Sequence, residues 1–148
     1  AEALAREGDR IGVVWGERVD LGGRRIIKKK KAFWDATPDD KKVFVANPAR
    51  GSRHNRGCAV DVTLYHLDTG RAADMGSVYD EASPRSYVTW EGGTRGQLER
   101  RELLREALAR EGFFVYAWEW WHFDFKDWRD YPVLNVPFEE IGRSAPAR

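Results

Sequence analysis

The stretch S-R-H-N-R-G-C-A-V-D-V-T, residues 52–63, combines a loop with the start of a strand. Small and polar residues over 50–57 predict the loop. In C-A-V-D-V-T-L, residues 58–64, apolar side chains alternate with smaller or polar ones, which predicts a strand with one apolar face. Asp61 projects from the opposite face, where a carboxylate is stable only if a cleft, a partner or a metal receives it.

Further elements follow towards the C-terminus. Residues 68–96 are rich in Asp, Gly, Ser and Thr and predict a long irregular connection of the kind that often carries function. Thr94, with a glutamine three residues later, forms a capping-box pattern that predicts a helix ending at Gly112. Two short strands are predicted next, over 113–116 and 120–125.

The N-terminal part predicts three more elements. Residues 1–7 resemble the last turns of a helix that stops at Gly8, and 11–15 form a short apolar run typical of a strand. Residues 26–35 carry one apolar stripe, which predicts a helix with its lysines facing outward.

Composition restricts the class of protein. A chain of 148 residues with 42% hydrophobic content predicts one folded domain over 1–148. Its 25 basic and 24 acidic residues predict no nucleic-acid partner, and no apolar stretch is long enough for membrane insertion. The single cysteine, Cys58, allows no intrachain disulfide, which favours a cytoplasmic location, although a removed leader would leave no trace. Nothing in the sequence specifies an oligomeric state.

Four residues are candidates for a catalytic metal site. A catalytic zinc site uses three protein ligands, keeps one position open and has a carboxylate nearby as general base. His54, seven positions before Asp61, and His122 could supply the ligands, with Glu119 as the base that takes a proton from water and later gives it to the leaving amine. Both spacings also occur by chance, and E-x-x-H in an aromatic strand equally fits a buried histidine satisfied by an acid.

Three linked motifs resemble the D-alanyl-D-alanine dipeptidases of the VanX type. They are S-R-H-N-R-G-C-A-V-D-V-T-L-Y-H-L-D-T-G, D-M-G-S-V-Y-D-E-A-S-P-R-S and E-W-W-H-F-D-F-K-D-W. The resemblance implies an α+β fold with a small antiparallel sheet flanked by helices, as in D,D-carboxypeptidases and the hedgehog signalling domain. It also implies one Zn²⁺ per chain, with His54, Asp61 and His122 as ligands and Glu119 as catalytic base.

The resemblance assigns further roles to residues of this chain. Ser52 matches a substrate-contacting serine, and Asp80 matches an acid that holds the free amino group of the substrate. Counting back along the family pattern places the arginine that stabilises the transition-state oxyanion at Arg25. Here G-G-R-R-I departs from the family's D-x-Y-R-P-like motif, so Arg24 is an alternative, and either residue could be an ordinary surface arginine.

The function implied by the resemblance is hydrolysis of D-alanyl-D-alanine, or of a similar small D-amino-acid dipeptide, in bacterial cell-wall turnover or glycopeptide resistance. A D,D-carboxypeptidase or endopeptidase acting on peptidoglycan stem peptides is the nearest alternative. A non-catalytic zinc-binding module is the second, favoured by the altered arginine motif and by an N-terminus that is short relative to the family. The retained Glu119 argues against that module.

Overall fold

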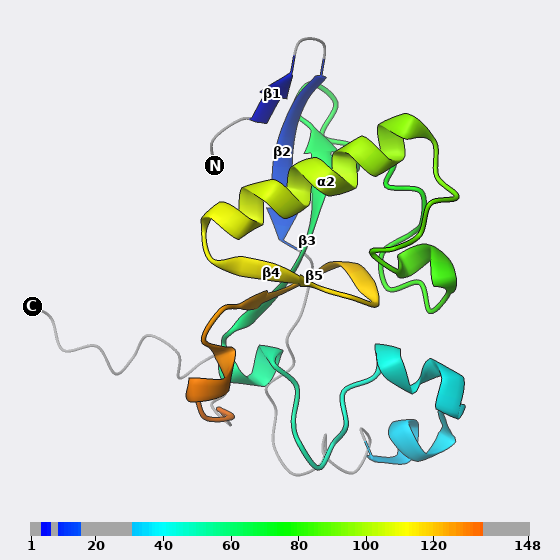
Figure 1. Ribbon diagram of the computed structural model, residues 1–148, viewed down its shortest axis with the longest axis vertical. Coiled ribbons are helices and arrows are strands. Elements are labelled where there is room, and N and C mark those ends of the chain that lie inside the picture. The colour runs from blue at the N-terminus through cyan, green and yellow to red at the C-terminus, as the bar shows by residue number, and fades with distance from the viewer. Residues whose placement is uncertain (1–3, 7–8, 16–30, 135–148) are drawn as a thin grey trace, which may run out of the picture. The chain divides into compact units, whose positions relative to one another are not determined.

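The computed structural model describes residues 4–6, 9–15 and 31–134, and the side chains of 31–134 (Figure 1). The chain divides into two units. Unit 1 contains Ala1–Glu17 and Ala59–Lys126, and unit 2 contains Arg18–Cys58 and Asp127–Arg148. The single domain over 1–148 stays a prediction.

Unit 1 is built on a five-stranded sheet in the order β1-β2-β3-β5-β4. Every neighbouring pair in it is antiparallel. The strands are β1 (Leu4–Arg6), β2 (Asp9–Trp15), β3 (Ala59–His66), β4 (Phe113–Tyr116) and β5 (Glu119–Phe125). β3 and β5 are therefore direct neighbours although more than fifty residues separate them.

The N-terminal expectations have mixed outcomes. The helix expected over 1–7 is wrong for the described residues, because Leu4–Arg6 is a strand whose Leu4 lies opposite Ile11 of β2. Seven residues are too few to form a stable helix alone, whereas pairing with β2 satisfies backbone groups along one side of Leu4–Arg6. The strand expected at 11–15 is confirmed within β2. Of the helix expected over 26–35, residues 31–35 are helical, and the rest lies outside the described residues.

The helix expected after Thr94 is confirmed as α2 (Arg95–Arg110). The Thr94 side chain accepts a hydrogen bond from the Gln97 backbone N–H at 3.3 Å, and Gln97 Oε1 accepts one from the Thr94 N–H at 2.8 Å. These two bonds satisfy donors that the first turn of a helix leaves without partners. Gly112, just beyond the end of the helix, has the left-handed φ of 81° that favours glycine there.

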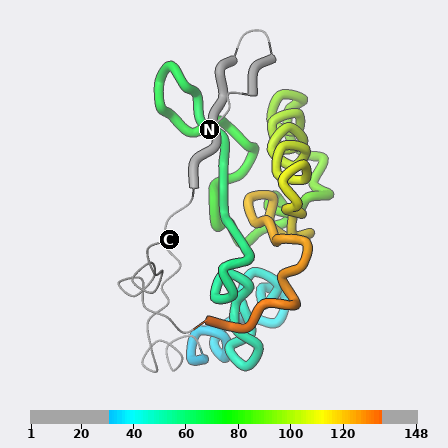
Figure 2. The backbone as a smooth tube through the Cα atoms, turned by 90° about the vertical axis from the view of Figure 1, so that its left-hand side faces the viewer, coloured from blue at the N-terminus to red at the C-terminus, as the bar shows by residue number. Residues whose placement is uncertain are grey.

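The core of unit 1 lies between α2 and the sheet. Figures 1 and 2 show α2 on one side of β3, and α2 packs on both β3 and β4. The buried cluster there comprises Val62, Leu64, Ala73, Met75, Leu104, Trp120, Trp121 and Phe123. An antiparallel sheet covered by a helix confirms the expected α+β class.

The connection between β3 and α2 is irregular, as expected, and the buried Arg101 fastens it to the helix. Apart from one bridge, Tyr65 with Ala72, it contains only the 3-10 turn η3 (Pro84–Ser86). Arg101 Nε donates to the Met75 carbonyl oxygen at 2.7 Å. Its guanidinium lies 4.8 Å from the ring centre of Trp90 and 5.4 Å from that of Trp120.

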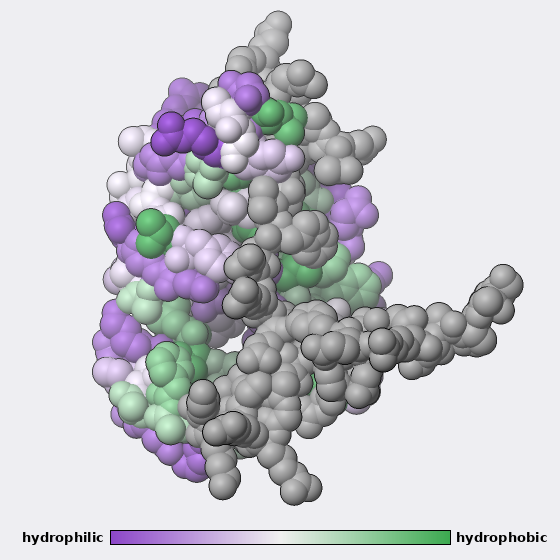
Figure 3. All heavy atoms as spheres, turned by 180° about the vertical axis from the view of Figure 1, so that it is seen from behind, coloured by the Kyte–Doolittle hydropathy of each residue, from purple (hydrophilic) through white to green (hydrophobic). Residues whose placement is uncertain are grey.

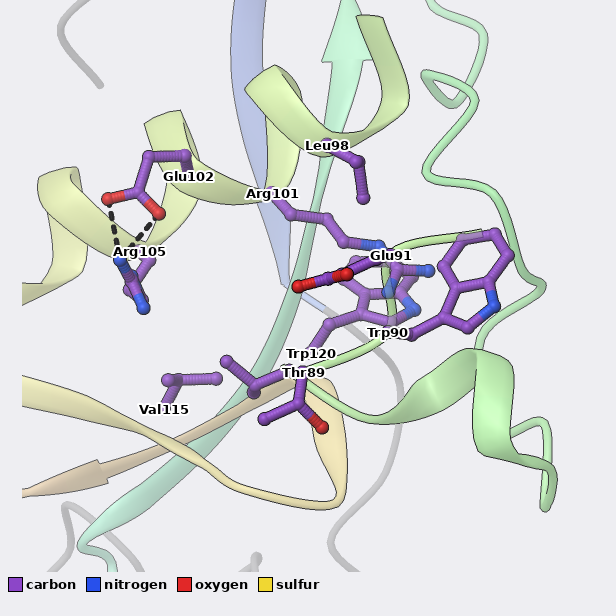
Figure 4. A pocket seen from close by; sticks show the side chains of 10 residues that line it. Thr89, Trp90, Glu91, Leu98, Arg101, Glu102, Arg105, Val115 and Trp120 are labelled. Carbon is purple, nitrogen blue, oxygen red and sulfur yellow. Dashed lines mark hydrogen bonds and ion pairs between the residues drawn. The ribbon is translucent and has the colours of Figure 1, made fainter. Parts of the chain in front are cut away.

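Arg101, Trp90 and Trp120 line part of a cavity of about 300 Å³ (Figure 4). Burial lowers the pKa of Arg101 to about 10, so the side chain stays charged at neutral pH. Gly76 lets the connection pass close to Trp90, because a Cβ at Gly76 would lie 2.6 Å from that indole.

Replacing Arg101 with methionine should destabilise the fold by about 1–3 kcal/mol. The variant leaves the Met75 carbonyl oxygen without its buried donor and removes the cation between the two indoles. Urea unfolding measures the change. Arg105→Met is the control, since Arg105 lies one helical turn further on and pairs with Glu102 at the surface. Equal stability of the two variants would contradict a fastening role for Arg101.

The described part of unit 2 contains three short 3-10 turns, η1 (Asp39–Phe44), η2 (His54–Arg56) and η4 (Trp128–Asp130). The segments around η2 and η4 lie side by side, because the Leu134 N–H donates to the Asn55 carbonyl oxygen at 2.6 Å. Three guanidinium groups also surround the Trp128 indole, those of Arg53, Arg56 and Arg129.

Several large apolar side chains of the described chain are exposed, among them Phe33, Val78 and Phe114. Figure 3 shows hydrophobic and hydrophilic residues intermingled on one face of the molecule. Among the described residues, no helix is both long and apolar enough to cross a membrane.

Candidate metal centre

Asp61 and His122 are brought together by the register of β3 and β5. Their Cα atoms are direct partners across the antiparallel pair, so both side chains project from the same face of the sheet. The carboxylate Oδ1 of Asp61 lies 3.0 Å from Nδ1 of His122. His122 is buried, with 7% of its surface exposed, and Asp61 Oδ1 is shielded from solvent. The imidazole and this carboxylate oxygen are therefore held together away from solvent.

Glu119 begins β5, and its Oε2 lies 3.7 Å from the same Nδ1 of His122. Burial raises the pKa of Glu119 to about 7; nearby His122 opposes the rise, and the charges of Asp61, Asp80 and Asp124 add to it. A carboxyl group that titrates near neutral pH can both accept and return a proton under physiological conditions.

Asp124 lies at the opposite edge of the His122 ring, with its Oδ1 3.1 Å from Nε2. Burial by itself lowers the pKa of His122, but the hydrogen-bonding contacts with Asp124 and Asp61, together with their charges, outweigh burial and raise it to about 9. No role was predicted for Asp124 from the sequence. The available signal was the H-x-D spacing, which puts two side chains on the same face of one strand.

Tyr79 and Asp80 bring the irregular connection close to these carboxylates. Burial raises the pKa of the Tyr79 hydroxyl well above its usual value, and the charges of Asp61, Asp80 and Glu119 and a hydrogen bond with Asp61 contribute to the rise. Its ring packs 5.6 Å from that of Trp121. Asp80 has a left-handed backbone with φ of 60°, a conformation that non-glycine residues adopt at a cost and often at functional sites. Sequence patterns gave no signal for Tyr79.

Ser52 and His54 lie in the loop that leads into β3. Ser52 Oγ accepts a hydrogen bond from the His54 backbone N–H at 3.2 Å, which shapes the start of η2. Gly57 then takes a left-handed φ of 69°, where a side chain would be strained, and the chain enters the strand. Gly57 thus has the backbone conformation that this bend requires.

Asp61 and His122 of unit 1 each offer a ligand atom to a metal ion, and His54 of unit 2 is the third ligand that the sequence predicts. Two imidazoles and a carboxylate are the nitrogen and oxygen donors that zinc takes in catalytic sites. Arg25 and its alternative Arg24 lie outside the described residues, and their roles stay predictions.

The metal-free protein should lose stability as pH rises from about 5 to 9. The pKa of Glu119 is raised from 4.5 to about 7, and that of His122 from 6.5 to about 9. Between the unfolded and folded values of each group the folded chain binds more protons than the unfolded chain, so the free energy of unfolding falls with rising pH. Urea unfolding at pH 5, 7 and 9 after chelation measures this slope.

A matched pair of variants tests the source of the slope. Glu119→Gln removes one of the two groups and should flatten the profile between about pH 4.5 and 7. Glu111→Gln changes an exposed glutamate and should leave the profile as it is. A parent profile that stays level or climbs over this range would contradict the burial of these two groups.

Comparison with known proteins identifies relatives. The family model described as D-ala-D-ala dipeptidase matches residues 27–141. Proteins named D-alanyl-D-alanine dipeptidase from Enterococcus faecalis and Enterococcus faecium are 36% and 38% identical, each over 71% of this chain and over 58% and 49% of their own lengths. One of that name from Escherichia coli is 35% identical over 72% of this chain and 53% of its own length.

The chain thus spans about half the length of the curated relatives it matches. The family match covers most of the chain, including both motifs that supply the candidate ligands. The resemblance seen in the sequence is confirmed: the chain belongs to the D-alanyl-D-alanine dipeptidase family.

Proposed function

We propose that the chain catalyses zinc-dependent hydrolysis of the amide bond of D-alanyl-D-alanine or of a similar small D-amino-acid dipeptide. The observation that carries the proposal is the grouping of Asp61 and His122 with Glu119, a partly buried carboxyl group whose pKa is raised to about 7. A purely structural metal site has no need of such a group. The names of the relatives supply the substrate.

His54, Asp61 and His122 would hold the ion. Their donor set fits zinc, because catalytic zinc sites use three ligands of these types and leave a position open. When bound, the ion would supply Lewis acidity, polarising a carbonyl and lowering the pKa of water to about 7. The shielding of Asp61 Oδ1 and His122 from solvent strengthens the charge interaction between them.

Glu119 would move the proton. Its carboxylate takes a proton from the attacking water at a side-chain oxygen and then gives that proton to the departing amine. A pKa of about 7 suits both steps, because neither the charged nor the neutral form is strongly favoured near neutral pH. Arg25, or Arg24 in its place, would stabilise the negative charge that develops on the carbonyl oxygen.

Asp80 and Ser52 would orient the substrate. A free dipeptide carries an ammonium group, and the negative charge that Asp80 places near Glu119 offers it a partner. A longer peptide lacks this ammonium next to the scissile bond, so Asp80 favours the free dipeptide over a peptidoglycan stem.

The single cysteine, Cys58, is a buried thiol, which fits a side chain packed in the core. A single thiol also fits the cytoplasmic location that we propose for the chain.

Release of D-alanine by the zinc-loaded chain tests the proposal. The substrates are D-alanyl-D-alanine, its N-acetyl derivative, L-alanyl-L-alanine and a pentapeptide ending in D-alanyl-D-alanine. The first alone should be cleaved efficiently, since it has both the ammonium group and the required stereochemistry. Cleavage of only the pentapeptide would replace the proposal with a D,D-carboxypeptidase. Zinc binding without cleavage of any substrate would favour a binding module.

A further inference from the structure

The His122 ring lies between carboxylates at its two edges. Asp61 and Glu119 face Nδ1, at 3.0 and 3.7 Å, whereas Asp124 alone faces Nε2, at 3.1 Å. We propose that Asp124 is a positioning residue, whose carboxylate accepts the Nε2–H of His122 and so reserves Nδ1 for the metal ion. The inference rests on the proposed function, because it concerns how one of the proposed ligands is presented.

The proton count of the ring supports this assignment. An ionised carboxylate has no hydrogen to donate, so the contact with Asp124 is a hydrogen bond only when Nε2 carries a proton. A neutral imidazole has one N–H and one lone pair. With the proton held at Nε2, the lone pair is at Nδ1, which faces Asp61. A metal ion at Nδ1 takes that lone pair and removes its repulsion from the Asp61 carboxylate, whereas the opposite tautomer would leave a lone pair against the Asp124 carboxylate.

Burial makes the contact with Asp124 persistent. Asp124 and His122 each have 7% of their surface exposed, so water competes little for either partner. Asp124 lies in β5, which runs between β3 and β4. Its Cα pairs with that of Ala59 in β3 on one side and with that of Phe114 in β4 on the other. The Tyr116 ring meets the imidazole edge-on, with centroids 5.5 Å apart. The imidazole is therefore fixed in orientation as well as in tautomer.

The position of Asp124 separates its role from that of Glu119. Glu119 and Asp61 share the Nδ1 edge, where a ligand and a base would both be needed. Asp124 is at the far edge, and it is not one of the three proposed ligands. A carboxylate behind a metal-binding histidine raises the basicity of the ring and fixes its direction, and loss of such a partner typically costs about 10–100-fold in metal affinity.

Zinc affinity and the ring proton of His122 together test the inference. Affinity is measured by competition with a chelator for the parent, Asp124→Ala, Asp124→Asn and the exposed control Asp127→Asn. Nitrogen-15 spectra of the histidine rings in the zinc-loaded chain report which nitrogen carries hydrogen. We expect Asp124→Ala to bind zinc about 10–100-fold more weakly. Asp124→Asn keeps an acceptor oxygen, so it should retain the Nε2–H and recover part of the affinity, and Asp127→Asn should match the parent.

The outcomes separate the inference from the proposed function. A parent that binds no zinc, or binds it without changing the His122 ring signals, overturns both. Zinc binding at Nδ1 with unchanged affinity and tautomer in both Asp124 variants overturns the inference alone. Zinc bound at Nε2 also overturns it. If Asp124→Ala does not fold, Asp124→Asn decides, because a weaker zinc complex with the Nε2 proton retained supports a positioning role.

Discussion

Glu119→Gln is expected to slow hydrolysis of D-alanyl-D-alanine by about 10²–10⁴-fold, which is the typical contribution of a general acid–base group. Glutamine has nearly the same size and keeps an oxygen near His122 Nδ1, but it cannot accept and return a proton. The loss should appear in kcat, because Glu119 is not one of the proposed ligands and Asp80, the proposed partner of the ammonium group, is unchanged.

The fold and the metal provide the controls for this variant. A buried carboxyl group with a pKa raised to about 7 costs stability when it is ionised, so Glu119→Gln should be at least as stable as the parent at pH 8. Its zinc content should match that of the parent, and the exposed Glu111→Gln should keep full activity. Retention of activity in Glu119→Gln would remove Glu119 from the mechanism, whereas loss of zinc would make it a ligand.

Asp61→Asn is expected to weaken zinc binding by more than the about 10–100-fold that the loss of a supporting residue typically costs, because it removes the charge from a proposed direct ligand. The Asp61 carboxylate is the only anionic member of the candidate ligand group. Competition against a chelator measures the affinity. Asp68→Asn, an exposed aspartate just beyond β3, is the control and should bind zinc like the parent.

The metal-free form of Asp61→Asn gives a second readout. Asp61 helps to raise the pKa of His122 to about 9, so the pKa of His122 should fall when the charge of residue 61 is removed. Titration of the His122 ring signals measures this directly. Normal zinc affinity together with a lowered pKa would show that Asp61 contacts His122 without holding the metal, and the ligand group would then be wrong.

The local elements of this chain could be predicted from sequence because their signals are local. The capping box at Thr94 and the glycine at 112 bound α2 by hydrogen bonds and backbone angles within a few residues of each end. Alternation in β3 places Asp61 opposite to the apolar face in the same way. The helix predicted over 1–7 was wrong at residues 4–6, because the structure of this short segment depends on pairing with β2 rather than on its own sequence pattern.

The sequence by itself therefore determined the helix, the strands of the site and the candidate ligands, since side-chain periodicity and motif spacing are properties of the chain alone. Only the tertiary structure decided that β3 and β5 pair with Asp61 opposite His122, because alternation fixes the face of a strand but neither its partner nor its register. It also decided the pKa of Glu119 and the place of Asp124 behind the ring. Both depend on burial, which arises only when segments distant in sequence exclude water together.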